Sequence, residues 1–226
     1  MSRHETAVDR LGTEIIEGRR AVGSVFTTAQ VEAELGISRS VAREAVRVLE
    51  SLGLVSTSPR VGCSVQGPAH WNTLSPQIIR WRMNGPDQMR QLRALTELRA
   101  GVEPQAAALA ARRASWDDIA TLEATAQAME QLGAQGLGDT DDFLRADLDF
   151  HARLLQATGN PAYVALGPTI LTCLETRNQA GLTPAKPSPE NLRRHTDLAV
   201  AIRERDEHAA RDLARQLVEC VVQEVQ

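Results

Sequence analysis

The stretch that decides the fold is LGISRSVAREAVRVLE, residues 35–50. Gly36 ends a short helix expected over residues 29–35, and Ser38 is a suitable N-cap for a longer helix that Gly53 terminates. The apolar residues of the longer helix recur at helical spacing and form one stripe, namely Val41, Ala45, Val48, Leu49 and Leu52. Two helices joined by such a turn are typical of a helix-turn-helix, whose second helix enters the major groove of DNA N-terminus first.

The residues on either side extend this motif to a winged helix. Residues 5–18 place apolar side chains at helical spacing before a glycine and predict a first helix. Two short runs rich in β-branched residues, 54–57 and 63–65, flank the turn sequence Pro59-Arg60-Val61-Gly62 and predict a hairpin. Residues 1–67 are therefore expected to form three helices and a two-stranded wing.

Chemistry that faces the groove is expected early in the longer helix. Arg39 and Arg43 are four residues apart and project from one face, and Ser40 is short enough to let the backbone approach phosphate or a base edge. Arg47 extends this face by one turn. The alternative is that these arginines form surface ion pairs with the glutamates of the same helix, or remain solvated.

Beyond residue 67 the strand signals stop and helical spacing continues to the end of the chain. The spacing of Trp71, Leu74, Ile78 and Trp81 predicts a connecting helix that ends near residue 85. Six more helices are expected over residues 87–113, 116–133, 140–157, 161–180, 190–204 and 206–225. The fold class is mainly α, with a winged helix over 1–67, a connector over 68–85 and an all-α antiparallel bundle over 86–226.

Composition excludes several classes of protein. The 226 residues are 42% hydrophobic and 24% charged, which is ordinary globular usage, and no run is apolar enough to span a bilayer. The N-terminus lacks the features of a secretory signal, so we expect a cytoplasmic protein. The three cysteines are widely spaced without a CxxC pair, and we expect them to be reduced.

The net charge of −4 is unevenly distributed. Residues 1–67 hold 8 basic and 8 acidic residues, whereas residues 68–226 hold 17 basic and 21 acidic residues. The excess acid therefore lies outside the segment that is expected to bind DNA, and the whole-chain charge does not argue against nucleic-acid binding.

The C-terminal half carries a pattern that suits a divalent cation. Asp147 and His151 are four residues apart, so their side chains lie one turn apart on the same helix face. Two such groups can bind one metal ion, although a surface pair is the alternative reading. His195, after a proline-rich loop, is the only other histidine in a suitable position.

The N-terminal motifs resemble the winged helix of the GntR family of bacterial transcription regulators. The resemblance rests on IIEGR at 15–19, on the stretch at 35–50, and on GLV at 53–55 followed by Gly62. Two departures are Val22 where the family usually has proline, and Ala29 where it often has arginine.

That resemblance implies which residues contact DNA. Arg39, Ser40 and Arg43 would contact the operator, with Arg47 one turn further along the same face. The wing tip, from Arg60 to Gly62, would contact the minor groove or the backbone. The implied partner is double-stranded operator DNA, which a homodimer would bind. No membrane is implied as a partner.

The second half resembles the all-helical effector domain of the FadR branch, also called the FCD domain. The matching segments are ELR at 97–99, VEP at 102–104, RADLDFH at 145–151, GNP at 159–161, and His195 with the residues that follow it. Members of this branch that bind metal use an aspartate, a histidine four residues later and two further histidines. The resemblance to the FCD domain also implies that residues 86–226 bind an effector and form the dimer.

Mapped onto this chain, the metal ligands fall on Asp147, His151, His195 and Leu217. Leucine cannot coordinate a cation, so the fourth ligand is absent. His208 lies nine residues earlier in the same helix and faces the opposite side. Two imidazoles and a carboxylate would suit Zn, Ni, Mn or Fe and leave positions open for water or an anionic effector.

The resemblance also implies the kind of effector. A small carboxylate such as a sugar acid is expected, with Arg99 and Arg177 as the effector-binding cations. An alternative for Arg99 is a structural salt bridge to a neighbouring helix. The connector from Trp71 to Trp81 resembles that of members that respond to sugar acids, especially galactonate.

The leading hypothesis is a homodimeric transcription regulator, most often a repressor in this family, released by its effector with a divalent metal assisting. One rival is a metal-dependent enzyme that acts on a small carboxylate through Asp147, His151 and His195. We find no general acid and base set and no nucleophile motif in the sequence, so we expect that the chain is not an enzyme. A further alternative is an interaction module whose bundle only dimerises.

Overall fold

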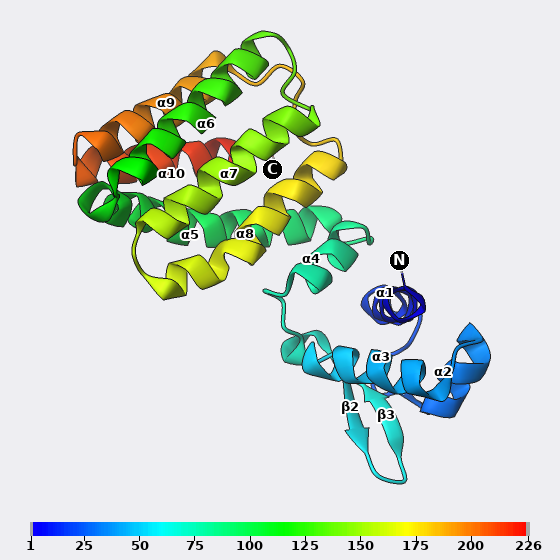
Figure 1. Ribbon diagram of the computed structural model, residues 1–226. Coiled ribbons are helices and arrows are strands. Elements are labelled where there is room, and N and C mark those ends of the chain that lie inside the picture. The colour runs from blue at the N-terminus through cyan, green and yellow to red at the C-terminus, as the bar shows by residue number, and fades with distance from the viewer. Residues whose placement is uncertain (1, 225–226) are drawn as a thin grey trace. The chain divides into compact units, whose positions relative to one another are not determined.

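The computed structural model describes residues 2–224, which form two compact units that divide between residues 88 and 89 (Figure 1). The N-terminal unit contains α1 (Arg3–Ile16), β1 (Val25–Phe26), α2 (Thr28–Leu35), α3 (Arg39–Ser51), β2 (Val55–Ser58), β3 (Gly62–Val65), the 3-10 turn η1 (Pro68–His70) and α4 (Pro76–Met83). The other unit contains α5 (Gln88–Arg113), α6 (Trp116–Ala134), α7 (Asp141–Ala157), α8 (Pro161–Gln179), α9 (Pro189–Arg203) and α10 (Glu207–Glu224).

Local capping sets the ends of the DNA-binding helices. Thr27 and Gln30 form a capping box at the start of α2, and Gly36 ends that helix in the left-handed conformation. Ser38 accepts a hydrogen bond from the backbone N–H of Val41 and so caps α3. The apolar stripe of α3 packs with α1, the strands and Trp81 in one core, which fixes the outward face of α3.

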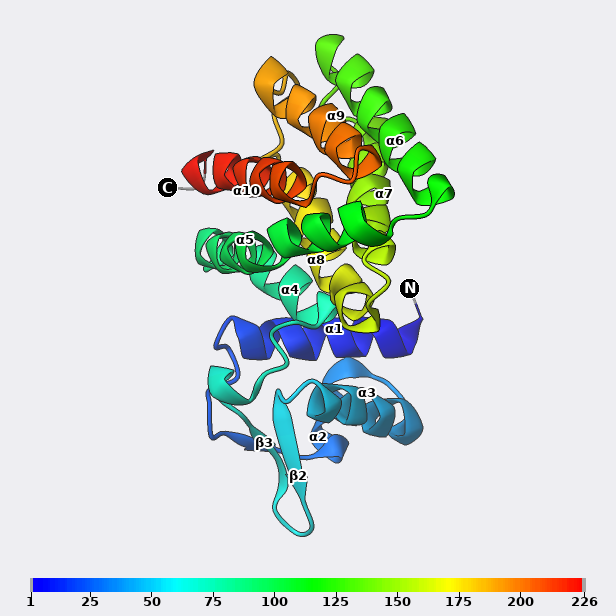
Figure 2. The same ribbon diagram turned by 90° about the vertical axis from the view of Figure 1, so that its left-hand side faces the viewer.

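The wing is a three-stranded antiparallel sheet with the strand order β1-β3-β2. Sequence reasoning predicted β2 and β3 but missed β1, which is only two residues long and therefore shows no alternation. β1 pairs Val25 and Phe26 with Ser64 and Cys63, whereas β2 pairs along the whole length of β3. The hairpin of β2 and β3 extends beyond the helices of its unit, with one edge of β2 free (Figure 2).

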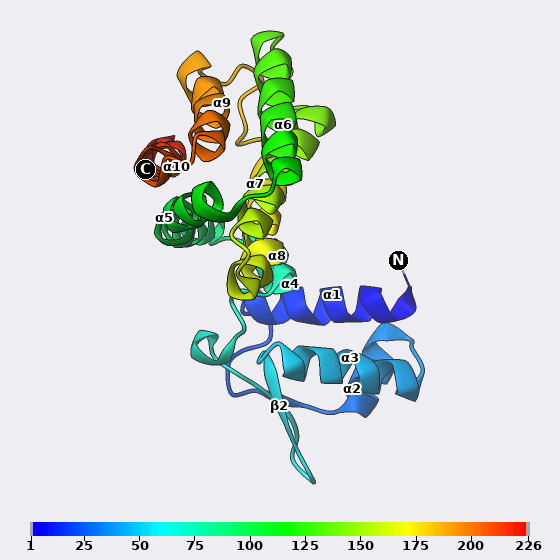
Figure 3. The same cartoon turned by 60° about the vertical axis from the view of Figure 1, so that its left-hand side comes forward.

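The connector helix belongs structurally to the N-terminal unit. It begins at Pro76 rather than near Trp71, because the turn before it is held by a hydrogen bond from Asn72 N to Leu52 O. α4 packs against α1 (Figure 3). The indole N–H of Trp81 in α4 donates to Asp9 Oδ1 in α1 at 3.2 Å. A Cβ on Gly12 would come within 2.3 Å of the Trp81 ring, so glycine is what allows this approach.

The C-terminal unit is a bundle of helices. α6 packs against α7 and α9, α9 against α10, and α7 against α8. The core is built around large apolar side chains that include Phe150, Leu122, Met129 and Leu154. The six predicted helices are confirmed, with ends within two residues of those expected, and residue 225 lies outside the described part.

None of the helices described is long and apolar enough to cross a membrane. All three cysteines are free thiols.

Candidate DNA-binding surface and candidate metal and effector site

The first turns of α3 present unpaired arginines to solvent. Arg39, Ser40 and Arg43 are exposed, and neither arginine has an ion pair or side-chain hydrogen bond within residues 2–224. Glu44 pairs instead with Arg47, at 2.7 Å between Oε1 and Nη1. The expected alternative, in which the helix's glutamates neutralise Arg39 and Arg43, is therefore not what the structure contains. Both charges are available to a phosphate or a base edge.

The wing tip holds an arginine in an unusual backbone conformation. Residues Ser58 to Val61 form a turn, with Pro59 second and Arg60 third, closed by a hydrogen bond from Val61 N to Ser58 O at 3.3 Å. Arg60 has φ 67°, a value that this position of a type II turn requires and that glycine ordinarily supplies. Gly62 follows with φ 107°, and a Cβ there would come within 2.7 Å of Phe26 O. The tip keeps an exposed cation at a cost of about 1 to 2 kcal/mol.

A groove of about 320 Å³ lies between α3 and the wing. Its lining includes Thr27 and Thr28 at the start of α2, Arg43 and Arg47 of α3, and Gly62 of the wing. Three of the predicted DNA contacts, Arg43, Arg47 and Gly62, thus share one concave surface, whereas Arg39, Ser40 and Arg60 are not among its lining residues.

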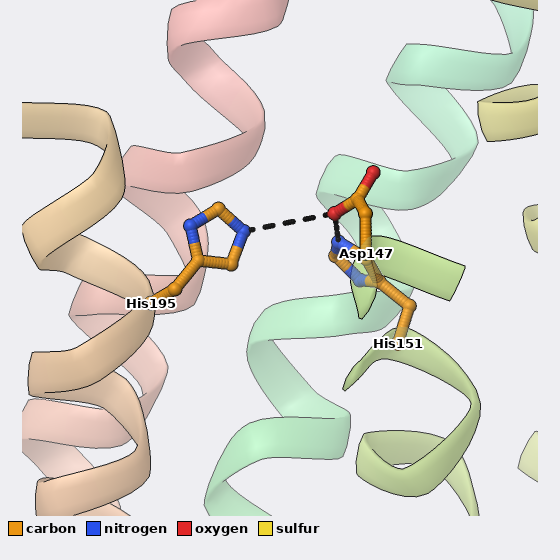
Figure 4. Close-up of side chains that lie close together, drawn as sticks. All are labelled: Asp147, His151 and His195. Atoms are coloured by element: carbon orange, nitrogen blue, oxygen red, sulfur yellow. Dashed lines mark ion pairs between the residues drawn. The ribbon is translucent and has the colours of Figure 1, made fainter. Parts of the chain in front are cut away.

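In the C-terminal unit, Asp147 and His151 of α7 meet His195 of α9 (Figure 4). One ligand atom from each side chain lies within 4.8 Å of the other two. His151 Nε2 is 3.4 Å and His195 Nε2 is 3.9 Å from the same oxygen, Asp147 Oδ1. Both histidines are buried, and the Asp147 side chain is 18% exposed.

The other nitrogen of each imidazole faces an oxygen on the opposite side. His195 Nδ1 lies 3.0 Å from the backbone carbonyl oxygen of Asn191, which can accept its proton. His151 Nδ1 lies 3.2 Å from Glu103 Oε2, although it is not aligned as a regular hydrogen bond. In metal sites an outer oxygen of this kind directs the free Nε2 lone pair toward the cation. Both rings therefore have the orientation that a shared metal ion would need.

Glu103 and Arg99 form a buried layer behind this cluster. Arg99 Nε donates to Glu103 Oε1 at 2.6 Å and its Nη2 to Oε2 at 3.3 Å, both side chains being almost inaccessible to solvent. Arg99 Nη2 also lies 3.4 Å from His151 Nε2. The ion pair that was the alternative reading of Arg99 is present, but within α5 rather than to a neighbouring helix. Sequence reasoning assigned no role to Glu103; its i,i+4 spacing from Arg99 was the available signal.

The electrostatics of the cluster separate its two histidines. Burial opposes protonation of His151, but the carboxylates of Glu103 and Asp147 outweigh it and raise its pKa to about 9. Burial dominates at His195 and lowers its pKa to about 4. At Asp147, burial alone would raise the pKa. The hydrogen bond and the charge of His151 lower it by more, so the net shift of the Asp147 pKa is downward. Asp147 is thus an anion beside one neutral imidazole and one imidazole that prefers a proton.

A small cavity of about 60 Å³ opens beside Asp147. Arg177 of α8 lines it together with Thr183 and Ser188 of the following loop and Asn191 of α9. Arg99 is not among the lining residues. Of the two arginines expected to bind the effector, Arg177 is the one beside the cavity.

The predicted fourth-ligand position is apolar. Leu217 is 5% exposed and belongs to the bundle core with Phe143, Phe150 and Leu198. His208 is exposed on α10. The cluster that the structure supports is therefore the three-residue set that sequence reasoning retained, which fits a divalent cation with open coordination positions.

A winged helix with free arginines on its recognition helix, joined to a helical bundle with an inward polar cluster, defines a DNA-binding transcription regulator with a sensory domain. Comparison with known families agrees. The FCD domain matches residues 94–219, more than half of the chain, and the family described as "Bacterial regulatory proteins, gntR family" matches residues 3–65. The chain belongs to the GntR family and carries an FCD effector domain. It is a regulator and not an enzyme, because the matched families and named relatives are transcription regulators.

Several individual proteins are similar over nearly the whole chain. The galactonate operon transcriptional repressor of Escherichia coli K12 is 28% identical over 220 residues, covering 96% of this chain and 94% of that protein. The transcriptional repressor NanR of Cronobacter sakazakii is 26% identical over 237 residues, covering 91% and 86%. The solved structure of Streptococcus agalactiae GntR is 26% identical with a TM-score of 0.54, covering 97% of this chain and 99% of that one.

Proposed function

We propose that this protein is a homodimeric repressor that binds a pseudo-palindromic operator and leaves it when a small sugar acid binds the FCD domain. The observation that carries the proposal is the convergence of two imidazole Nε2 atoms on the carboxylate of Asp147, beside a cavity that Arg177 lines. The similarity to the galactonate operon repressor makes galactonate the first effector to test.

In this proposal Asp147, His151 and His195 hold a divalent cation, one of Zn, Ni, Mn or Fe. When bound, the cation would supply Lewis acidity to a carboxylate oxygen of the effector. Glu103 and the Asn191 carbonyl orient the two imidazoles.

Arg177 is proposed to meet the effector carboxylate from the cavity side, with Arg99 adding positive charge from the buried layer behind. The cavity of about 60 Å³ holds about two water molecules. Pockets that enclose small ligands are usually about 300 Å³ or larger. Binding therefore requires the loop that includes Thr183 and Ser188 to move outward, and this displacement is the proposed start of the signal.

On DNA, each protomer is proposed to place Arg39, Ser40 and Arg43 in the major groove, with Arg47 along the same face. The tip from Arg60 to Gly62 is proposed to reach the adjacent backbone or minor groove. Two heads related by a two-fold axis require a half-site spacing of one helical turn of DNA or a multiple of it.

The test uses the full-length protein and a fluorescent duplex from the region upstream of its own gene. Tighter binding to this duplex than to random DNA, with affinity falling as salt rises, supports the DNA assignment. Galactonate with added Zn²⁺ should raise the melting temperature and release the duplex, and Asp147→Asn should abolish both effects of galactonate. Release without any need for Asp147 would contradict the proposed site, and no preference for the upstream duplex would contradict the proposed operator.

A further inference from the structure

An acidic side chain lies on the surface that is expected to face DNA. Glu50, near the end of α3, is exposed and lines the same groove as Arg43 and Arg47. A carboxylate there repels the phosphate backbone and weakens binding unless it has another task. Its neighbour Glu44 pairs with Arg47, but within residues 2–224 Glu50 has no such cation.

The carboxylate of Glu50 instead holds the wing. Its Oε1 accepts a hydrogen bond from the backbone N–H of Thr57 at 2.8 Å and another from the Thr57 hydroxyl at 2.6 Å. These two bonds lower the pKa of Glu50, so the group stays ionised. Glu50 Oε1 thus links the recognition helix α3 to strand β2.

The geometry of the strand explains why this contact is needed. β2 is the edge strand, and Thr57 faces Cys63 in a pair whose neighbours, Ser56 with Ser64 and Ser58 with Gly62, lie on either side. The backbone N–H of Gln66 donates to Leu54 O, and because bonded and non-bonded pairs alternate, the N–H of Thr57 points to the free edge. Glu50 occupies the place that a further strand would have taken.

The contact between Glu50 and Thr57 also lies close to the tip of the hairpin, where it can position Arg60. Thr57 is one residue before the tip turn that begins at Ser58 and carries Arg60. β1 and the residues just before it support β3 along its other edge, at Cys63, Ser64 and Val65, and not at β2. Within the described residues, the hydrogen bonds from Thr57 to Glu50 are the side-chain hydrogen bonds that join β2 to α3.

We propose that Glu50 is a positioning residue that fixes the wing against α3, so that Arg60 reaches DNA at a set distance from Arg39 and Arg43. The proposal rests on the proposed contact between the wing and DNA. It assigns to a DNA-facing carboxylate a favourable effect on DNA affinity, opposite in sign to its direct electrostatic effect.

The experiment compares Glu50→Ala with Glu44→Ala in the full-length protein. Each variant removes one exposed carboxylate from α3, so electrostatics alone predicts tighter binding to the upstream duplex for both. We expect Glu44→Ala to bind at least as tightly as wild type and Glu50→Ala to bind about three- to tenfold more weakly. Equal or tighter binding by Glu50→Ala would overturn the proposal.

A double-mutant cycle with Arg60→Ala shows whether Glu50 acts through the wing. If it does, Glu50→Ala should cost little further affinity once Arg60 has been removed. Losses that multiply independently would overturn the proposal. If Arg60→Ala leaves affinity unchanged, the wing contact itself has failed, which separates that outcome from a failure of Glu50.

The hydrogen bonds between Glu50 and Thr57 can also be tested without DNA. Hydrogen exchange at the Thr57 amide should be slow in wild type, although the amide lies on a free edge, and should become fast in Glu50→Ala. Glu50→Gln keeps an oxygen acceptor and should restore part of the protection and part of the affinity. Thermal unfolding should be nearly unchanged in Glu44→Ala, Glu50→Ala and Glu50→Gln because the substituted side chains are exposed. A Thr57 amide that exchanges fast in wild type would overturn the proposal that Glu50 holds β2 against α3.

Discussion

Replacing Arg99 with methionine should destabilise the C-terminal unit far more than removal of an ordinary surface charge. The side chains of Arg99 and Glu103 are 4% and 3% exposed, and two N–H groups of the guanidinium donate to the carboxylate. Removal of one partner of a buried ion pair costs about 3 to 5 kcal/mol, here because, among residues 2–224, the Glu103 carboxylate keeps only His151 beside it. For a unit of this size, about 3 °C is lost per kcal/mol, so the transition should fall by about 9 to 15 °C.

Differential scanning calorimetry of the full-length protein is the appropriate assay, because two units give two transitions that a single melting temperature would merge. Arg112→Met is the matched control: it also breaks an Arg–Glu pair, with Glu207, in the same unit, but the Arg112 side chain is 59% exposed. We expect the control to cost less than about 1 kcal/mol. The double variant Arg99→Met with Glu103→Leu should recover most of the lost stability, because no charge is left alone.

Two results would contradict this prediction: a cost of Arg99→Met no greater than that of Arg112→Met, or a double variant less stable than either single one. The first result would mean that water reaches the Arg99 and Glu103 layer. The second would mean that Glu103 stabilises the unit mainly through His151, which it also contacts.

Four further predictions concern single sites. Arg60→Gly should raise the melting temperature of the N-terminal unit by relieving the positive φ, worth about 1 kcal/mol, yet weaken binding to the upstream duplex in anisotropy titrations. Leu217→His should tighten Zn²⁺ binding in calorimetric titrations by supplying a fourth ligand, and unchanged affinity would place that side chain outside the site. Because the proton on His151 competes with a metal up to its pKa of about 9, apparent Zn²⁺ affinity should rise about tenfold per pH unit from 7 toward 9 and then level off. Gly12→Ala should force the Trp81 ring away and lower the melting temperature of the N-terminal unit by several degrees, while unaltered Trp fluorescence and stability would contradict the close packing.

Most helices could be predicted because their signals are local. A cap such as Ser38 and a stop such as Gly36 act within one turn of chain, so the ends of α2 and α3 follow from neighbouring residues. β1 carries no such signal, since two residues become a strand only by pairing with β3. The start of α4 likewise depends on a distant partner, the carbonyl of Leu52.

The candidate metal site likewise combines a local signal, which the sequence shows, with contacts between distant residues, which it does not show. The i,i+4 spacing of Asp147 and His151 was readable in the sequence, and His195 was the only other histidine in a suitable position, but its role as a ligand beside that pair was implied by the family resemblance. Two interactions at the candidate sites were missed because both partners look ordinary in isolation: Glu103 beside His151, and Glu50 beside Thr57. Glu103 contacts a residue 48 positions away on another helix, whereas Glu50 contacts a residue seven positions away, across the turn from α3 into β2.

The packing of Trp81 against Gly12 has a practical consequence for building hybrid sensors. A chimera joined at residue 67 would remove α4, uncover the face of α1 at Gly12 on which the Trp81 ring packs, and leave Asp9 without the hydrogen bonds that Gln77 and Trp81 donate to it. A junction between residues 88 and 89 would transfer the head with its own connector intact. New sensory domains should therefore be grafted onto an 88-residue cassette rather than onto the winged helix alone.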